Sequence, residues 1–226
     1  MRLRQKVAAE FVGSAFLVAA VIGSGAAASR LSPHDVGLQL LENSIVTGAV
    51  LVALILALHP VSASFNPVIT ALERVLGAIT SRVAVALICA QLAGAVTGAV
   101  IANLMFDLPA VSLSTHTRTG SGLWLGEVVA TLGLVLIVFG TLRGTESSRV
   151  AYAVGGYITG AYWFTSSTSF ANPAVTLART LSDTFAGIAP ASVPVFILAQ
   201  LLGGAAGLGV LTLLHPRRRE PVATTP

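Results

Sequence analysis

The chain has 226 residues, of which 54% are hydrophobic and only 10% are charged. Because soluble domains carry about 25% charged residues, this composition excludes an ordinary soluble domain and predicts a polytopic membrane protein whose apolar surface faces lipid. The net charge of +4 comes from basic residues at the ends of apolar runs, which does not indicate a nucleic-acid partner, and the single cysteine, Cys89, excludes an internal disulfide.

Six long apolar segments are predicted to cross the membrane. They run roughly Val7–Ala28, Val36–Leu58, Val83–Phe106, Leu123–Leu142, Val150–Phe164 and Val193–Leu214. A transmembrane helix needs about 20 residues to cross about 30 Å of hydrocarbon, so the fifth segment is short unless residues 165–168 extend it. Two shorter apolar pieces remain, Pro67–Gly77 and Pro173–Leu181. At about 1.5 Å per residue, each reaches only about half-way across a bilayer, which predicts two half-helices.

Both half-helices begin with an Asn-Pro pair. Asn is a preferred helix N-cap and Pro is preferred at the first helical position, so each pair predicts a helix start. Two such starts that meet inside the bilayer would point their positive dipole ends at one place and oppose the passage of cations, including protons. The asparagine amides can donate hydrogen bonds to a passing solute. The residues predicted to form this central constriction are Asn66, Pro67, Val68, Asn172, Pro173 and Ala174.

The two halves of the chain repeat each other beyond these motifs. The matching landmarks are Glu10 with Glu127, Gln91 with Gln200, and the pair Gly94 and Gly98 with the pair Gly203 and Gly207. Each half contains three crossings, so the two repeats must be inverted in the membrane. The predicted fold is an all-α membrane protein of six transmembrane helices plus two re-entrant half-helices. We expect a single channel domain over residues 1–226, with repeats at about 1–110 and 120–215 and a short basic tail at 216–226.

The basic residues predict the orientation of the chain. With both termini in the cytoplasm, Arg30, Arg118 and Arg179 fall outside and the remaining loop cations fall inside. Those inside are Arg2, Arg4, Lys6, Arg74, Arg82, Arg143, Arg149, Arg217, Arg218 and Arg219. This excess of cytoplasmic Lys and Arg is what the positive-inside rule requires.

The doubled Asn-Pro motif, the glutamate in the first helix of each repeat and the Ala-Gln…Gly pattern in the third resemble the major intrinsic protein family, the aquaporins and aquaglyceroporins. The second triplet, Asn172-Pro173-Ala174, matches the family's Asn-Pro-Ala motif in full, whereas the first has Val68 in place of Ala. The resemblance covers nearly the whole chain. It implies an aquaporin-like bundle that assembles as a homotetramer, with a pore in each subunit.

The selectivity filter departs from the family pattern. The family usually has an arginine directly after the second triplet, where this chain has Val175. The resemblance places the other filter residues at Thr47, Gly160 and Ser169. Small residues at all four positions imply a wide outer filter that lacks a fixed cation. If Phe170 faces the pore in place of Ser169, the channel is narrower.

One filter position depends on a gap in the match. Thr47 assumes a one-residue deletion before the first triplet, where Ser64 would stand in place of the family's usual histidine. A valine at position 175, preceded by Thr168-Ser169-Phe170, is similar to a bacterial subgroup associated with arsenic resistance. That similarity implies residence in the bacterial inner (plasma) membrane and passage of neutral metalloid acids such as arsenite, with glycerol and methylated arsenicals as further solutes.

Two intramembrane glutamates are predicted to support the re-entrant loops. Glu10 and Glu127 lie in apolar segments, where a charge is costly, and we expect them to accept hydrogen bonds from the folded-in loops. Proton coupling by either glutamate is the alternative, which would make the protein a secondary transporter. Arg179 lies one turn beyond Val175 and is expected to be a surface arginine, paired with Asp183. The alternative is that Arg179 partly replaces the missing charge of the filter.

Nothing in the sequence indicates an enzyme. The histidines, at positions 34, 59, 116 and 215, lack the spacing of metal ligands, and no nucleotide-binding loop is present. We therefore expect no catalytic residue, metal or cofactor. The predicted function is passive conduction of small neutral solutes (water, glycerol-like polyols and arsenite-type acids), with a non-conducting structural protein as a further alternative.

Overall fold

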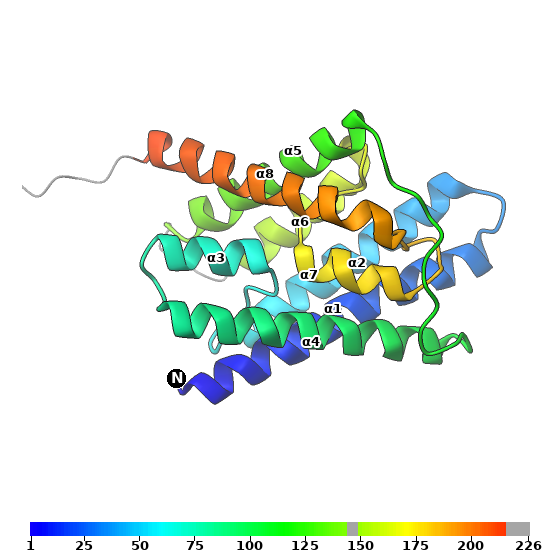
Figure 1. Ribbon diagram of the computed structural model, residues 1–226, viewed down its shortest axis with the longest axis horizontal. Coiled ribbons are helices and arrows are strands. Elements are labelled where there is room, and N and C mark those ends of the chain that lie inside the picture. Colours follow the sequence, from blue (N-terminus) through cyan, green and yellow to red (C-terminus); the bar gives the residue numbers. More distant parts are fainter. Residues whose placement is uncertain (144–148, 216–226) are drawn as a thin grey trace, which may run out of the picture.

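The computed structural model describes residues 1–143 and 149–215, and the described chain is helical throughout its regular structure. The elements are α1 (Leu3–Leu31), α2 (Val36–Leu58), α3 (Pro67–Val75), α4 (Ser81–Met105), α5 (Ser121–Thr141), α6 (Arg149–Phe164), α7 (Pro173–Ala178) and α8 (Val193–Leu214), with 3₁₀ turns η1 (Arg179–Leu181) and η2 (Pro190–Ser192) (Figure 1). The predicted class, six long helices and two half-helices, is confirmed. The predicted basic tail at 216–226 lies outside the described residues.

Five of the described helices are long and apolar enough to cross a membrane. They are α1, α2, α4, α5 and α8 with the turn before it. The sixth long helix, α6, has 16 residues and ends at Phe164. Residues 165–167 form a turn, so they do not extend the helix as the sequence left open. The backbone amide of Thr168 closes this turn by donating to the Thr165 carbonyl oxygen at 3.2 Å.

The two halves pack in the same pattern. In the first half, α1 contacts α2 and α4, and in the second, α5 contacts α6 and α8; α2 and α6 join the halves. The half-helices α3 and α7 lie in line between α4 and α8, with their starts toward each other (Figure 1). This is the arrangement that an inverted repeat with two broken helices requires.

Glycines set the close approach of the paired helices. A Cβ atom built on Gly98 would lie 2.1 Å from the Ala15 carbonyl oxygen, and one on Gly203 would lie 2.4 Å from the Val128 carbonyl oxygen. Both are far inside van der Waals contact, so only a residue without a side chain allows the backbones to meet here. Small residues at four-residue spacing produce such contacts in membrane bundles.

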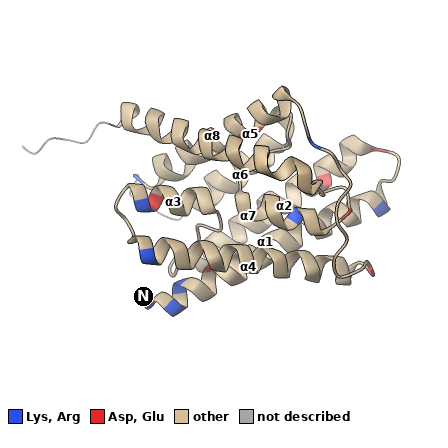
Figure 2. Cartoon of the chain, in the orientation of Figure 1, with Lys and Arg blue, Asp and Glu red and all other residues tan. Residues whose placement is uncertain are grey.

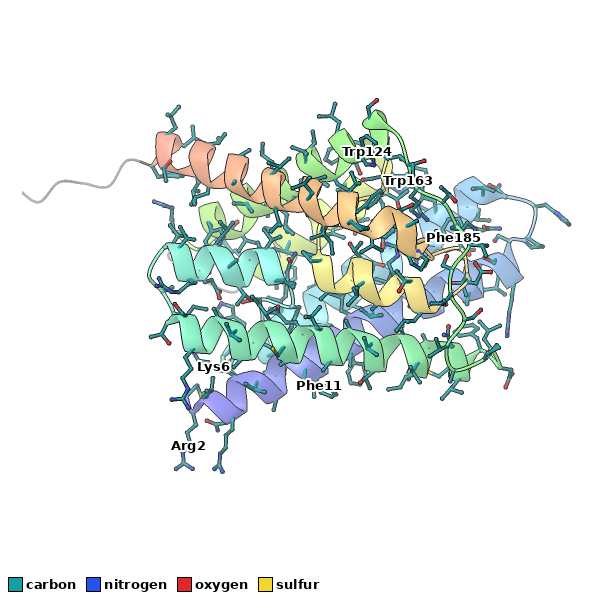
Figure 3. All side chains as sticks on the ribbon, viewed as in Figure 1. Arg2, Lys6, Phe11, Trp124, Trp163 and Phe185 are labelled. Carbon is teal, nitrogen blue, oxygen red and sulfur yellow. The ribbon has the colours of Figure 1, made fainter. Side chains whose placement is uncertain are left out.

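Charge is concentrated at the ends of the bundle. Lys and Arg gather at the end where the N-terminus, the end of α3 and the start of α4 lie (Figure 2). Arg2 and Lys6 project from this end, whereas Trp124, Trp163 and Phe185 lie toward the opposite one (Figure 3). The helices between the two ends expose large apolar side chains, as helices facing lipid do.

Candidate solute pore

Each half-helix begins with the cap that its Asn-Pro pair predicts. The Asn66 side chain accepts a hydrogen bond from the Val68 backbone amide at 2.9 Å, with Pro67 at the first helical position. The Asn172 side chain accepts from the amides of Ala174 and Val175 at 3.0 and 3.3 Å. Both side-chain oxygens are thus turned toward their own helix, which leaves the amide N–H groups to point away from it.

The two asparagines also bind the opposite loop. Asn66 Nδ2 donates to the Ala171 carbonyl oxygen at 2.8 Å, and Asn172 Nδ2 donates to the Phe65 carbonyl oxygen at 2.7 Å. These reciprocal bonds fix the starts of α3 and α7 against each other. An amide carries two N–H groups, and the bonds described for each asparagine use one of them.

The residues before the asparagines have strained backbones. Phe65 and Ala171 have φ angles of 46° and 48°, in the left-handed region that residues with a Cβ rarely adopt. Their amides are held by the intramembrane glutamates: Phe65 donates to Glu10 at 2.7 Å, and Ala171 donates to Glu127 at 2.9 Å. Such conformations persist where the surroundings determine them fully, and they are common at functional sites.

Each glutamate accepts further bonds from its own repeat. Glu10 accepts from the Ser62 hydroxyl and from the Ser64 amide at 2.6 and 2.9 Å. The Gln91 amide bridges Glu10 and the Thr70 hydroxyl at 2.7 and 2.8 Å.

The second repeat holds the same network. The Phe170 amide donates to Glu127 at 2.8 Å. The Gln200 amide bridges Glu127 and the Thr176 hydroxyl at 2.6 and 2.8 Å. Both glutamates are fully buried, so their oxygens are occupied by donors from the loops and from the third helix of each repeat.

A cavity of about 80 Å³ passes the two helix starts. Its polar lining comes mainly from the two asparagines and the loop residues before them, with the hydroxyl groups of Thr47 and Tyr162. The other lining side chains of α1, α2, α5 and α6 are apolar. The lining residues include Thr47, Asn66, Ile69, Ile158, Tyr162, Ser169, Phe170, Asn172, Val175 and Arg179.

Three of the four expected filter residues border this cavity. Thr47 lines it, and its hydroxyl lies 3.2 Å from the Tyr162 hydroxyl. Val175 and Ser169 line it too, and the buried Ser169 hydroxyl has no hydrogen-bond partner in the described part of the chain. The expectation for Gly160 was wrong. Gly160 is exposed on α6, and a Cβ built there would meet nothing within 4 Å.

The chain is similar in sequence to known membrane channels. Residues 1–155 match the sequence profile of the major intrinsic protein family. Over 226 residues the chain is 46% identical to aquaglyceroporin AqpS of Rhizobium meliloti (strain 1021), a match that covers 99% of this chain and 96% of that protein. The chain belongs to the major intrinsic protein family. As a member, it is an integral membrane channel for small neutral solutes and not an enzyme.

Two solved structures share the fold of this major intrinsic protein. The X-ray structure of the aquaglyceroporin from Plasmodium falciparum superimposes with a TM-score of 0.73 at 17% identity, covering 95% of this chain and 98% of that one. An ion channel of the FNT family gives a TM-score of 0.54 at 14% identity, with 92% and 87% covered. At these identities the likeness concerns the fold alone.

The α6 face that lines the pore follows helical spacing. Val150, Val154, Ile158 and Tyr162 all border the cavity at intervals of four residues. Gly160 lies half a turn from this stripe and therefore on the other side of the helix. The prediction of Gly160 counted back from Asn172 and assumed the loop length that is usual in the family. Counting four residues along α6 from Ile158 leads instead to Tyr162, which lines the cavity.

The expectation for Arg179 as a surface residue was also wrong. Only 2% of its surface is exposed, it lines the cavity, and its Nε donates to the Ala186 carbonyl oxygen. Asp183 instead accepts from the Thr115 amide at 2.8 Å and lies 3.6 Å from His116. The Thr115 bond holds the pKa of the Asp183 carboxyl below its usual value. An arginine therefore borders the cavity, although not at position 175, where the family usually has one.

Phe170 and Ser169 both border the cavity, so neither alternative of the sequence analysis excludes the other. The Phe170 ring packs edge-on against Phe196, with centroids 5.3 Å apart, in a cluster beside the pore. The guanidinium of Arg179 lies 3.4 Å from the centroid of the Phe170 ring, and that of Arg118 lies 5.1 Å from it. Neither Tyr162, which lines the cavity, nor Arg118, which contacts the Phe170 ring but does not line the cavity, was predicted from the sequence to lie here.

The remaining triplet residues shape the pore without lining it. Pro67, Pro173 and Ala174 form the first turns of the half-helices and do not border the cavity. Val68 is buried and packs toward α8, where its Cγ1 would lie 2.6 Å from a Cβ on Gly204. The replacement of the family's alanine by Val68 is therefore matched by a glycine on the facing helix.

Proposed function

We propose that this channel conducts water, glycerol-like polyols and neutral metalloid acids such as arsenite, passively and in either direction. The observation that carries the proposal is the cavity, whose lining combines the polar groups of the two asparagines and their loops with apolar side chains of the surrounding helices. A polyol carries both hydroxyl and C–H groups, so it matches a lining that is polar in part and apolar in part. The 46% identical relative is named an aquaglyceroporin, which supports the polyol part of the proposal.

The proposed mechanism starts from hydration. A solute that enters loses most of its water and regains hydrogen bonds from the free N–H groups of Asn66 and Asn172. Cations are opposed there, because the starts of α3 and α7 direct their positive dipole ends toward the same point. Neutral solutes have no such barrier. Arsenite is an uncharged molecule with three hydroxyl groups near neutral pH, and its size is about that of a small polyol.

A proton-coupled transporter is less well supported. Coupling would require Glu10 or Glu127 to exchange protons with the pore, yet each is fully buried and bound by several loop donors. Protonation would remove acceptors from backbone amides that have no water to replace them, at a cost of about 1–3 kcal/mol for each group. We therefore assign the two glutamates to holding the loops.

We further propose that the channel is a homotetramer in the bacterial inner membrane, with both termini in the cytoplasm. The large apolar side chains exposed on α1, α2, α4, α5 and α8 form a surface that can contact neighbouring subunits as well as lipid. The basic residues at the end that holds the N-terminus support the orientation. Native mass spectrometry and protease access to an N-terminal tag test the assembly and the orientation.

The function is tested by stopped-flow light scattering of proteoliposomes with a solute series. We expect water and glycerol fluxes above those of empty vesicles, fluxes that rise linearly with glycerol concentration, and no uphill uptake when a proton gradient is imposed. Saturation together with proton-driven accumulation would establish the transporter alternative. Vesicles that behave like empty ones would establish the non-conducting alternative.

A further inference from the structure

We infer that Arg179 is the solute-binding cation of the outer constriction, moved one helical turn from the position that Val175 occupies. The inference rests on the proposed passage of uncharged solutes and adds a residue and a solute class to it. The class is small neutral molecules with two neighbouring acceptor oxygens, such as vicinal diols and oxyacids.

Burial without a counter-charge is the first reason. Arg179 is almost fully buried inside the helical bundle, and within the described residues no carboxylate forms an ion pair with it. An arginine inside a membrane protein is expensive and marks a pathway for ions or solutes when it faces a cavity. Arg179 faces the cavity that passes Asn66 and Asn172.

The orientation of the guanidinium is the second reason. Its Nε donates to the Ala186 carbonyl oxygen, and its Cζ lies over the Phe170 ring, 3.4 Å from the ring centroid. These contacts fix the group and use one of its five donors, so the Nη groups carry no hydrogen bond within the described chain. A fixed guanidinium presents parallel N–H groups that match a pair of oxygens.

Further polar groups border the same part of the cavity. The Ser169 hydroxyl is buried and unpartnered, and the Tyr162 hydroxyl touches Thr47 at 3.2 Å. Together with Arg179 they can supply donors and acceptors to a solute from several directions. Val175 is aliphatic and leaves open the space that an arginine would occupy directly after the triplet.

Arg118 provides the matched control. It stacks on the same Phe170 ring at 5.1 Å, and its Nε donates to the Gly187 carbonyl oxygen at 2.9 Å, next to the Arg179 partner. It does not border the cavity. A purely structural role of the two arginines would make their replacements equivalent, whereas a role in the pore would separate them.

The test compares Arg179→Gln and Arg179→Lys with Arg118→Gln in proteoliposomes. The readouts are proton leak and the ratio of 1,2-propanediol to 1,3-propanediol permeability. We expect Arg179→Gln to raise the proton leak by at least about tenfold, because the barrier charge is gone. Arg179→Lys should keep protons out but lose the preference for the vicinal diol. Arg118→Gln should leave both readouts unchanged.

Two further measurements keep the inference open to refutation. The double variant Val175→Arg with Arg179→Val should restore proton exclusion. In the unmodified protein, 1,2-propanediol should slow water flux more than an equal concentration of 1,3-propanediol, a comparison that needs no variant to fold. Equal slowing by both diols, or leak and diol ratios unchanged in folded Arg179→Gln, overturns the inference. Absence of any polyol flux in the unmodified protein would instead overturn the proposed function.

Discussion

The first re-entrant loop, which leads into α3, and the second, which leads into α7, share their hydrogen bonds but differ in the charge that follows. Glu10 with Gln91 holds the first loop as Glu127 with Gln200 holds the second. The charged residues that follow differ: Glu73 and Arg179 occupy equivalent positions, at the same number of residues after Asn66 and Asn172 respectively.

These equivalent positions have different surroundings. Glu73 accepts from the Ser64 hydroxyl at 3.1 Å and is partly exposed toward one end of the bundle. Arg179 is buried on Phe170 and borders the cavity. The duplicated scaffold thus fixes the centre of the pore symmetrically, while the flanks can diverge and give each end of the channel its own charge.

The strongest test of the shared scaffold replaces its glutamates. Glu10→Leu and Glu127→Leu each leave two loop amides and one glutamine without an acceptor, at about 1–3 kcal/mol for each buried group. We expect both variants to lose most of the folded protein, measured as monodisperse yield in detergent. Glu10→Gln and Glu127→Gln keep one acceptor oxygen and should be milder. Tolerance of one leucine variant but not the other would contradict equal roles for the two loops.

The equivalent glycine contacts of the two repeats should differ in how much an added methyl group destabilises the fold. A Cβ on Gly98 would lie 2.1 Å from a backbone oxygen of α1, whereas one on the equivalent Gly207 would lie 2.9 Å from the Val135 Cβ. Overpacking costs about 1–3 kcal/mol, so Gly98→Ala should lower the melting temperature more than Gly207→Ala. Gly209→Ala is the control, because nothing lies within 4 Å of a Cβ there. Reversal of the order would show that the α1–α4 contact is the looser one.

The filter is probed by adding a second cation. Val175→Arg places a long charged side chain in the cavity beside Arg179. We expect glycerol and arsenite fluxes to fall by at least about tenfold, equivalent to about 1.4 kcal/mol, and water flux to fall less, because water is the smallest solute. Swelling rates for the three solutes measure this. An equal reduction of all three would count against Val175 as a filter residue.

The smallest expected effect is in the outer loop. Asp183→Asn removes an exposed carboxylate that Thr115 and His116 contact. Exposed pairs contribute little, so we expect a loss of at most about 1 kcal/mol. Because the folded-state pKa of Asp183 is lowered, its contribution is present above the unfolded-state pKa and disappears as the pH falls through the folded-state pKa. Melting temperatures of the two proteins should converge in acid; a constant difference would contradict this origin.

The sequence predicted the fold well because its signals are local. Apolar length and Asn-Pro starts placed the half-helices at Pro67 and Pro173, where the structure has them. The same signals could not orient α6, whose pore face depends on how the chain turns between Phe164 and Asn172. The same signals could not predict that Arg179 is buried, because a solvated arginine and one that contacts Phe170 have the same local sequence pattern.

We propose that two half-helix starts, joined by Asn66 and Asn172, border a path for neutral solutes. Glycerol-driven volume recovery of proteoliposomes, followed by light scattering, tests it most directly. Vesicles with the protein should shrink and then re-swell much faster than empty vesicles, without saturation. Re-swelling at the rate of empty vesicles, from protein shown to be folded and inserted, would contradict it.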